Sequence, residues 1–153
     1  MIEEKIKELT GYELPAAAKP LAAYVPARIA GNMIFTAGQL PTVDGKLIAE
    51  GKVDADVTVE KAAECARIAA LNCLSVIKAE IGSLEKIKKI VKLTVFVNSS
   101  DNFTGQPKVA NGASDFLINL FSDKGKHARS AVGVNELPVN APVEIEMIAE
   151  ISE

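Results

Sequence analysis

The feature of the sequence that most constrains the fold is a long apolar repeat between Thr58 and Ile81. Apolar residues recur there at intervals of three and four, which is the spacing of one helix face, and Gly82 follows the last of them as a C-cap. Because many of these residues are small, we expect a long helix that packs closely across a sheet. The repeat consists of Val59, Ala62, Ala63, Ala66, Ala69, Ala70, Cys73, Leu74, Ile77 and Ile81.

Two later segments alternate in the manner of β-strands. The first covers residues 89–97 and the second covers residues 143–151. Each has one fully apolar face, which predicts that this face lies against the helices. In the first segment that face carries Val91, Leu93, Val95 and Val97, and the opposite face carries Ile90, Lys92, Thr94 and Phe96. In the second, Val143, Ile145, Met147, Ala149 and Ile151 oppose Glu144, Glu146, Ile148 and Glu150.

The remaining segments predict an α+β fold. They are a helical extension at residues 1–13, an ordered proline-containing loop at 14–26, a hairpin turning at Gly31–Asn32, a strand near Leu47–Ile48, a helix over 109–121 that closes near Gly125, and a strand at 130–134. The order hairpin, helix, strand, helix and two strands predicts helices on one side of a largely antiparallel sheet. The other sheet face is mixed rather than polar, which predicts a homo-oligomer that covers it; its members include Ile90, Thr94, Phe96 and Ile148.

Composition narrows the class of protein. The 153 residues, 48% of them hydrophobic, predict a single domain spanning residues 1–153. A formal net charge of −3 argues against generic nucleic-acid binding. With one His and two Cys, the chain lacks the usual ligands of a zinc site.

Cysteine usage and the start of the chain indicate a cellular location. Cys65 and Cys73 are eight residues apart on the predicted helix, or about 12 Å at about 1.5 Å per residue, which is too far for a disulfide. Unpaired thiols are typical of a reducing compartment. The charged N-terminal segment does not resemble a secretory signal, and no apolar run approaches the roughly 18 residues of a membrane span. We therefore expect a cytoplasmic protein without membrane contact.

Most common catalytic and nucleotide-binding motifs are missing. The sequence contains no dinucleotide fingerprint, no phosphate loop and no nucleophile elbow. The single histidine, His127, is interpreted as a surface residue before a strand. The only basic cluster is interpreted as a solvated face, and it consists of Lys86, Lys88, Lys89 and Lys92.

Two charged residues are candidates for a binding or catalytic site. Arg129 opens one predicted strand and Glu144 opens the next. An arginine can bind a carboxylate through two parallel hydrogen bonds, and a glutamate can orient or deprotonate a water molecule. The alternative interpretation is an ordinary ion pair between neighbouring strands.

Two blocks of sequence resemble the Rid family of reactive intermediate deaminases (RidA/YjgF), whose members are also described as L-PSP endoribonucleases or translation inhibitors. The first block runs from Tyr24 to Pro41; the second runs from Ala128 to Pro138 and is followed by Val-Glu-Ile-Glu at 143–146. The resemblance implies a chorismate-mutase-like fold with a six-stranded, mainly antiparallel sheet backed by two helices. It also implies a homotrimer with ligand clefts between subunits.

The same resemblance implies site residues and a reaction. Arg129 matches the arginine that binds the substrate carboxylate, and Glu144 matches the glutamate that positions water. The matched residues of the binding site are Tyr24, Gly38, Asn111 and Ala131. The implied reaction is hydrolysis of 2-imino acids, such as 2-iminobutanoate and 2-iminopropanoate, to 2-keto acids and ammonia, without a cofactor or metal.

Three residues depart from the family pattern. Ala37 stands where the family usually has Ser, Ala131 where it has Cys, and His127 where it has Pro. Two alternatives to a deaminase therefore remain at this point. One is a protein that binds a small carboxylate without turnover, for example as a metabolite sensor. The other is a ribonuclease or translation inhibitor, against which the acidic balance and the lack of a second histidine argue.

Overall fold

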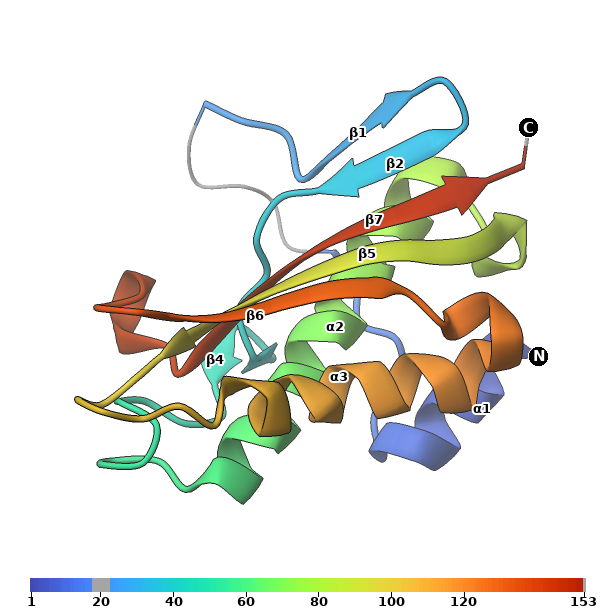
Figure 1. Ribbon diagram of the computed structural model, residues 1–153. Coiled ribbons are helices and arrows are strands. Elements are labelled where there is room, and N and C mark those ends of the chain that lie inside the picture. Colours follow the sequence, from blue (N-terminus) through green and yellow to red (C-terminus); the bar gives the residue numbers. More distant parts are fainter. Residues whose placement is uncertain (18–22, 153) are drawn as a thin grey trace.

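The computed structural model describes residues 1–17 and 23–152. Its main element is a five-stranded sheet with the strand order β1-β2-β7-β5-β6 (Figure 1). The strands are β1 (Ala27–Ala30), β2 (Met33–Thr36), β5 (Ile87–Asn98), β6 (Ala128–Val134) and β7 (Val143–Ile151). β5 and β6 are parallel, and the other neighbouring pairs are antiparallel.

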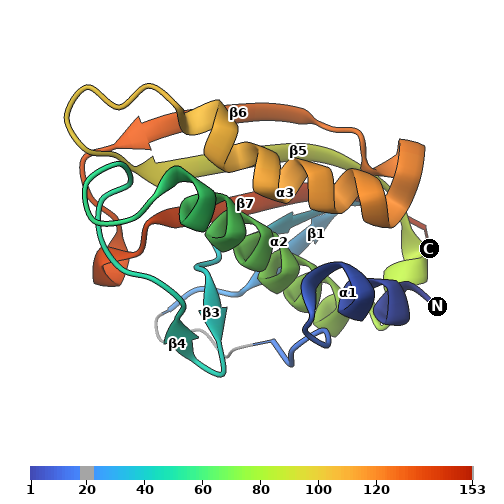
Figure 2. The ribbon, with the colours of Figure 1, turned by 90° about the horizontal axis from the view of Figure 1, so that it is seen from below.

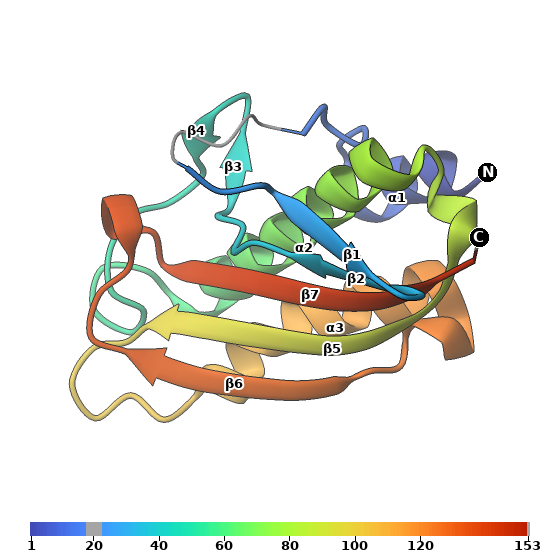
Figure 3. The same ribbon diagram turned by 90° about the horizontal axis from the view of Figure 1, so that it is seen from above.

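Three α-helices lie on one side of this sheet. They are α1 (Ile2–Thr10), α2 (Val59–Ile81) and α3 (Gln106–Phe121). α2 and α3 cover the sheet, and α1 lies beside them (Figure 2). Figure 3 looks onto the opposite face, which none of the described α-helices covers. We call this the open face, and it confirms the predicted α+β layer with helices on one side.

The sheet differs from the predicted six strands. β3 (Thr42–Val43) and β4 (Lys46–Leu47) pair only with each other, in a separate two-stranded ribbon. Asp44 and Gly45 turn that ribbon with φ angles of 50° and 78°, so the chain folds back on itself at once. β5 and β6 are parallel because α3 connects them as a crossover, which returns the chain in the same direction.

The predicted long helix is confirmed, and its ends have local causes. Thr58 is the N-cap and its side chain accepts a hydrogen bond from the Lys61 amide at 3.1 Å. Gly82 ends the helix with a φ of 85°, a conformation that glycine adopts without steric cost. The small-residue face allows α3 to approach closely: a Cβ built on Gly112 of α3 would lie 1.9 Å from the carbonyl oxygen of Ala63.

The face assignment of one residue in β5 was wrong. A register shift separates the pairs Ile90 with Ala149 and Lys92 with Ile148, so Val91 has no partner in β7. This bulge returns Ile90 to the helix-covered face, where it is buried. Strict alternation from Val91 onward had placed Ile90 on the open face. The other members of that face, such as Phe96 and Ile148, lie on the open side as predicted.

The N-terminal extension is helical over residues 2–10 and ends at Gly11. Ile6 is fully buried against the core, and Arg67 of α2 donates a hydrogen bond to the carbonyl oxygen of Leu9 at 3.2 Å. Glu3 forms an ion pair with Lys78 at 3.1 Å. α1 is therefore fixed to the body of the domain. The loop predicted for 14–26 includes residues 18–22, which lie outside the described residues.

The remaining short elements are three 3₁₀ helices, η1 (Leu84–Lys86), η2 (Ser122–Gly125) and η3 (Pro138–Asn140). In the described part of the chain, no helix is both long and apolar enough to cross a membrane.

Candidate functional site

Arg129 lies on the edge strand β6 and its side chain contacts α3. Its register partner in β5 is Leu93, a fully buried residue of the helix-covered face, so Arg129 belongs to that same side of the sheet. Its Nη1 donates to Asn111 Oδ1 at 2.9 Å and to Ser114 Oγ at 3.0 Å. Its Nη2 donates to the carbonyl oxygen of Pro107 at 3.5 Å. Asn111, one of the predicted binding-site residues, therefore contacts Arg129 directly.

These hydrogen bonds leave part of the guanidinium free. Both protons of Nη1 are engaged, while the Nε–H group and one Nη2 proton have no partner among the residues that the structure describes. The oxygens that contact Arg129 are neutral amide, hydroxyl and carbonyl groups. In residues 1–17 and 23–152, no carboxylate forms a salt bridge with Arg129. The guanidinium is thus held in place with its charge unpaired.

Glu144 is the second residue of β7 and lies on the open face. Its register partner is Phe96 of β5, which in turn pairs with Val132 of β6. Burial in this partly apolar row raises the pKa of the Glu144 carboxyl, and the negative charge of Glu146 raises it further. A carboxylate with a raised pKa is a stronger base toward water than an ordinary surface glutamate.

Gly38 lies directly against Glu144. Backbone hydrogen bonds join Gln39 and Ile145 in both directions, at 2.7 and 3.0 Å. They hold the segment after β2 beside the start of β7, which brings Gly38 to the Glu144 side chain. A Cβ built on Gly38 would lie 2.3 Å from Glu144 Oε1. Only glycine leaves room for the carboxylate in this position.

Arg129 and Glu144 do not meet within one chain. They belong to strands separated by β5, and their side chains lie on opposite faces of the sheet. The alternative of an ordinary ion pair between neighbouring strands is therefore wrong. The structure instead brings the predicted residues together in two separate groups, Arg129 with Asn111 and Gly38 with Glu144.

The other two predicted site residues, Ala131 and Tyr24, belong to neither group. Ala131 is two residues after Arg129 on β6, shares its side of the sheet and packs partly against the core. Tyr24 lies in the segment before β1 with its side chain 55% exposed. No hydrogen bond of the described residues links Tyr24 to either group.

Sequence reasoning missed two residues beside Arg129. His127 is half-buried rather than a surface residue, because its Nε2 lies 2.9 Å from Ser114 Oγ and its Nδ1 lies 2.6 Å from the carbonyl oxygen of Gly125. Burial lowers the pKa of His127, the hydrogen bond to the Gly125 carbonyl oxygen partly opposes this, and the positive charge of Arg129 lowers the pKa further. The spacing of Asn111 and Ser114, three apart on a helix, was the available signal that both face the same neighbour.

Neither cysteine has a place in this site. Cys65 and Cys73 are free and buried, as the helix spacing predicted. Burial raises the pKa of Cys73 to about 12, so its thiol stays protonated at neutral pH. Among the residues that can be described, no three His, Cys, Asp or Glu side chains cluster in a way that could hold a metal ion.

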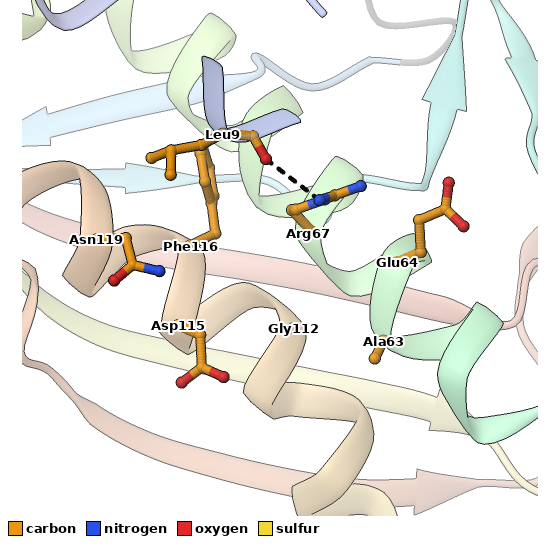
Figure 4. A pocket seen from close by; sticks show the side chains of 8 residues that line it. All are labelled: Leu9, Ala63, Glu64, Arg67, Gly112, Asp115, Phe116 and Asn119. Carbon is orange, nitrogen blue, oxygen red and sulfur yellow. Dashed lines mark hydrogen bonds between the residues drawn. The ribbon is translucent and has the colours of Figure 1, made fainter. Parts of the chain in front are cut away.

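A pocket of about 400 Å³ lies elsewhere, between α1, α2 and α3 (Figure 4). Leu9, Arg67 and Asn119 are among the residues that line it, and Arg67 donates a hydrogen bond to the carbonyl oxygen of Leu9. None of the predicted site residues contributes to its lining. The hydrogen bond between two of its lining residues attaches α1 to α2.

The family comparison identifies the domain. Residues 4–151 match the family described as "YjgF/chorismate_mutase-like, putative endoribonuclease". The chain belongs to the YjgF/RidA family. The resemblance carried by the Arg-Ser and Val-Glu-Ile-Glu blocks is thereby confirmed, and so is the chorismate-mutase-like fold of this family.

Relatives of the YjgF/RidA family match over nearly the whole chain. Protein TCP17 of Trypanosoma cruzi is 43% identical, covering 93% of this chain and 89% of the relative. The 2-iminobutanoate/2-iminopropanoate deaminase of Escherichia coli strain K12 is 34% identical, covering 94% of this chain and 96% of the relative. The crystal structure of the protein Atu1372 with unknown function from Agrobacterium tumefaciens is 44% identical, with a TM-score of 0.93, and covers 99% of this chain and 92% of that chain.

Proposed function

We propose that this YjgF/RidA protein hydrolyses 2-imino acids, such as 2-iminobutanoate and 2-iminopropanoate, to 2-keto acids and ammonia. The observation that carries the proposal is the unpaired guanidinium of Arg129, which only neutral oxygens hold. A buried or half-buried cation without a counter-ion is suited to a ligand that brings a carboxylate. Relatives at 31% and 34% identity are named 2-iminobutanoate/2-iminopropanoate deaminases, which supports a hydrolase role at the level of the family.

Arg129 binds the substrate carboxylate in this proposal. Its free Nε–H and Nη2–H groups are on one edge of the planar guanidinium, so they can donate two parallel hydrogen bonds to the two carboxylate oxygens. Asn111 and Ser114 hold the opposite side of the group through Nη1. The substrate is thereby fixed at its carboxylate, and the adjacent C2 carbon has a defined position.

In this proposal Glu144 positions the water molecule and transfers its protons. As a carboxylate it accepts a proton from water while the water oxygen bonds to the electrophilic C2 of the protonated imine. The same group then returns the proton to the nitrogen of the addition intermediate. Cleavage of the C2–N bond then releases ammonia while the hydroxyl on C2 gives its proton to the Glu144 carboxylate, which leaves the 2-keto acid. The protonated imine and one water are thereby converted into the 2-keto acid, ammonia and one proton that passes to solvent. The pKa of Glu144 is raised toward neutral pH, where a carboxyl group can both accept a proton from water and donate one to the leaving nitrogen.

We further propose that two subunits of a homotrimer complete each site. Arg129 and Glu144 of one chain lie on opposite sides of the sheet, so a single substrate can reach both only if they belong to different chains. The open face also exposes large apolar side chains: Phe35 is 40% exposed and Val132 is 43% exposed. Such side chains on the face that carries Glu144 favour contact with another copy of the chain.

The experiment is an assay of 2-iminobutanoate hydrolysis, with the imine generated in situ by an amino-acid oxidase. Wild type, Arg129→Ala and Glu144→Gln are compared with the reaction without protein. We expect Arg129→Ala to lose about 2 to 4 kcal/mol of transition-state stabilisation, roughly 30- to 1,000-fold in rate. Glu150→Gln, on the same strand but far along it, is the matched control and should keep full activity. Normal turnover by Arg129→Ala would refute the assignment of the site.

A second function, carboxylate binding without turnover, is favoured by one observation. Ala37 and Ala131 remove two polar side chains near the two site groups, where the family usually has Ser and Cys. If wild type does not accelerate hydrolysis but 2-ketobutanoate raises its thermal midpoint, the protein is a binder. The free, buried cysteines are consistent with a cytoplasmic location, which we propose for either function.

A further inference from the structure

A chain of three hydrogen bonds connects the backbone after α3 to the guanidinium of Arg129. The carbonyl oxygen of Gly125 lies 2.6 Å from His127 Nδ1, and His127 Nε2 lies 2.9 Å from Ser114 Oγ. Ser114 Oγ in turn accepts a hydrogen bond from Arg129 Nη1 at 3.0 Å. Three elements, η2, α3 and β6, therefore meet at one polar contact.

The direction of each bond in this chain is fixed by chemistry. A carbonyl oxygen can only accept, so His127 must carry its proton on Nδ1. A neutral imidazole has one N–H group, so Nε2 must accept, and the Ser114 hydroxyl proton points to it. The serine oxygen then offers its lone pairs to Arg129, which can only donate. For neutral His127, this is the one pattern that satisfies every bond.

The surroundings of His127 favour its neutral form. Burial lowers the pKa of His127, the hydrogen bond to the Gly125 carbonyl oxygen partly opposes this, and the positive charge of Arg129 on β6 lowers the pKa further. α3 contributes the uncharged Ser114 hydroxyl at this contact. On η2, the exposed Asp123 pairs with Lys126 at 2.6 Å, so these two charges compensate each other.

The backbone end of the chain is also held firmly. A Cβ built on Gly125 would lie 2.2 Å from the carbonyl oxygen of Leu117, so η2 lies tightly against the last turns of α3. Gly125 is buried, and its carbonyl oxygen has little freedom to move away from His127. The position of the imidazole is thereby set by the backbone rather than by solvent.

We propose that Ser114 and His127 are positioning residues, which orient Arg129 so that its Nε and Nη2 edge faces the ligand carboxylate. A serine hydroxyl rotates freely, and its proton would repel the guanidinium if it pointed that way. His127 removes that freedom by accepting the proton. The identity of the carboxylate ligand rests on the proposed function, whereas the hydrogen-bond chain itself does not.

The first test is NMR of the imidazole, which needs no ligand. Because His127 is the only histidine of the chain, its ¹⁵N and ¹³C resonances are unambiguous. We expect the Nδ1–H tautomer in wild type, a change in the Nε2 chemical shift in Ser114→Ala, and a raised His127 pKa in Arg129→Gln. An Nε2–H tautomer, or a His127 pKa that does not respond to Arg129→Gln, would overturn the proposal.

The second test separates positioning from general stability. His127→Phe and Ser114→Ala should raise the KM for 2-iminobutanoate, or the Kd for 2-ketobutanoate, by about fivefold or more, with kcat within about twofold of wild type. His127→Gln keeps an oxygen that can accept from Ser114, so it should restore most of the affinity. Asn119→Ala, exposed on the same helix, is the control. Equal affinity in all of these variants would refute the positioning role.

The two proposals fail in different ways. If wild type neither turns over the imine nor binds the keto acid, the proposed function is wrong, and the NMR result still decides whether Ser114 and His127 hold Arg129. If wild type is active and both His127→Phe and Ser114→Ala match it in KM and kcat, the function stands and the positioning role is wrong.

Discussion

Gly38 and Glu144 lie in such close contact that a methyl group on the glycine would come within 2.3 Å of the Glu144 Oε1 atom. We therefore expect Gly38→Ala to displace the carboxylate, since the end of a flexible side chain moves more easily than the backbone. Deaminase activity should fall about tenfold or more, because a displacement of about 1 Å at a reacting group is enough for such a loss.

The thermal midpoint of Gly38→Ala should stay close to that of wild type, because Gly38 has no positive φ angle that an alanine would strain. Ala37→Gly is the matched control, since it changes the adjacent residue without adding an atom near Glu144. Full activity in Gly38→Ala would mean that Glu144 does not act from the position seen in the structure.

Complementation between two inactive variants tests whether the site is shared between subunits. Arg129→Ala and Glu144→Gln each lack one group, but a mixed oligomer contains some interfaces where the intact Arg129 and the intact Glu144 meet. Unfolding and refolding a one-to-one mixture should therefore restore a measurable fraction of wild-type activity. A protein that carries both substitutions, mixed with itself, is the control. If the mixture stays as inactive as its components, the two residues do not act across an interface.

The pH dependence of activity should respond to Glu146. Burial raises the pKa of Glu144, and the charge of Glu146 raises it further. Because the proposed reaction uses the Glu144 carboxylate, we expect activity to fall as the pH drops through that pKa. Glu146→Gln lowers the pKa and shifts the acidic limb to lower pH. Same-face neighbours on a strand are about 7 Å apart, close enough for the charge of Glu146 to act on Glu144, so rates measured at closely spaced pH values should resolve the shift.

Glu150→Gln is the control for this pH shift. Glu150 lies on the same strand but pairs with Lys89 at 2.9 Å, away from Glu144. Its pH profile should match that of wild type. An unchanged acidic limb in Glu146→Gln would assign that limb to a different group.

Gly112 tests the contact between α2 and α3. In an open helix, Gly→Ala would stabilise the protein by about 1 kcal/mol through helix propensity. Here the added methyl would lie 1.9 Å from the Ala63 carbonyl oxygen, which is backbone and cannot move aside. We expect a net destabilisation of about 1 to 3 kcal/mol.

Urea unfolding of Gly112→Ala measures this change in free energy. Asn119→Ala, an exposed position on the same helix, should remain within about 0.5 kcal/mol of wild type. A more stable Gly112→Ala would show that the two helices can separate at little cost.

The elements of this fold could be predicted because their signals are local. The three-and-four spacing at 58–81 and the alternation at 143–151 follow from helix and strand geometry, which neighbouring residues express without reference to the rest of the chain. The bulge at Val91 could not be predicted this way. One extra residue in a strand moves the residues before it to the opposite face of the sheet. The apolar run at 89–97 contains no residue that marks the position of the bulge.

For the candidate site, the sequence by itself determined which groups are available: a guanidinium at Arg129 that can bind a carboxylate and a carboxyl at Glu144 that can accept a proton from water, in a chain of the YjgF/RidA family. Only the tertiary structure decided where these groups are. The α3 crossover makes β6 an edge strand beside β5, and the pairing register turns Arg129 and Glu144 to opposite faces. Contacts between residues distant in sequence decide which strands become neighbours and to which face each side chain points. Local periodicity does not encode these contacts.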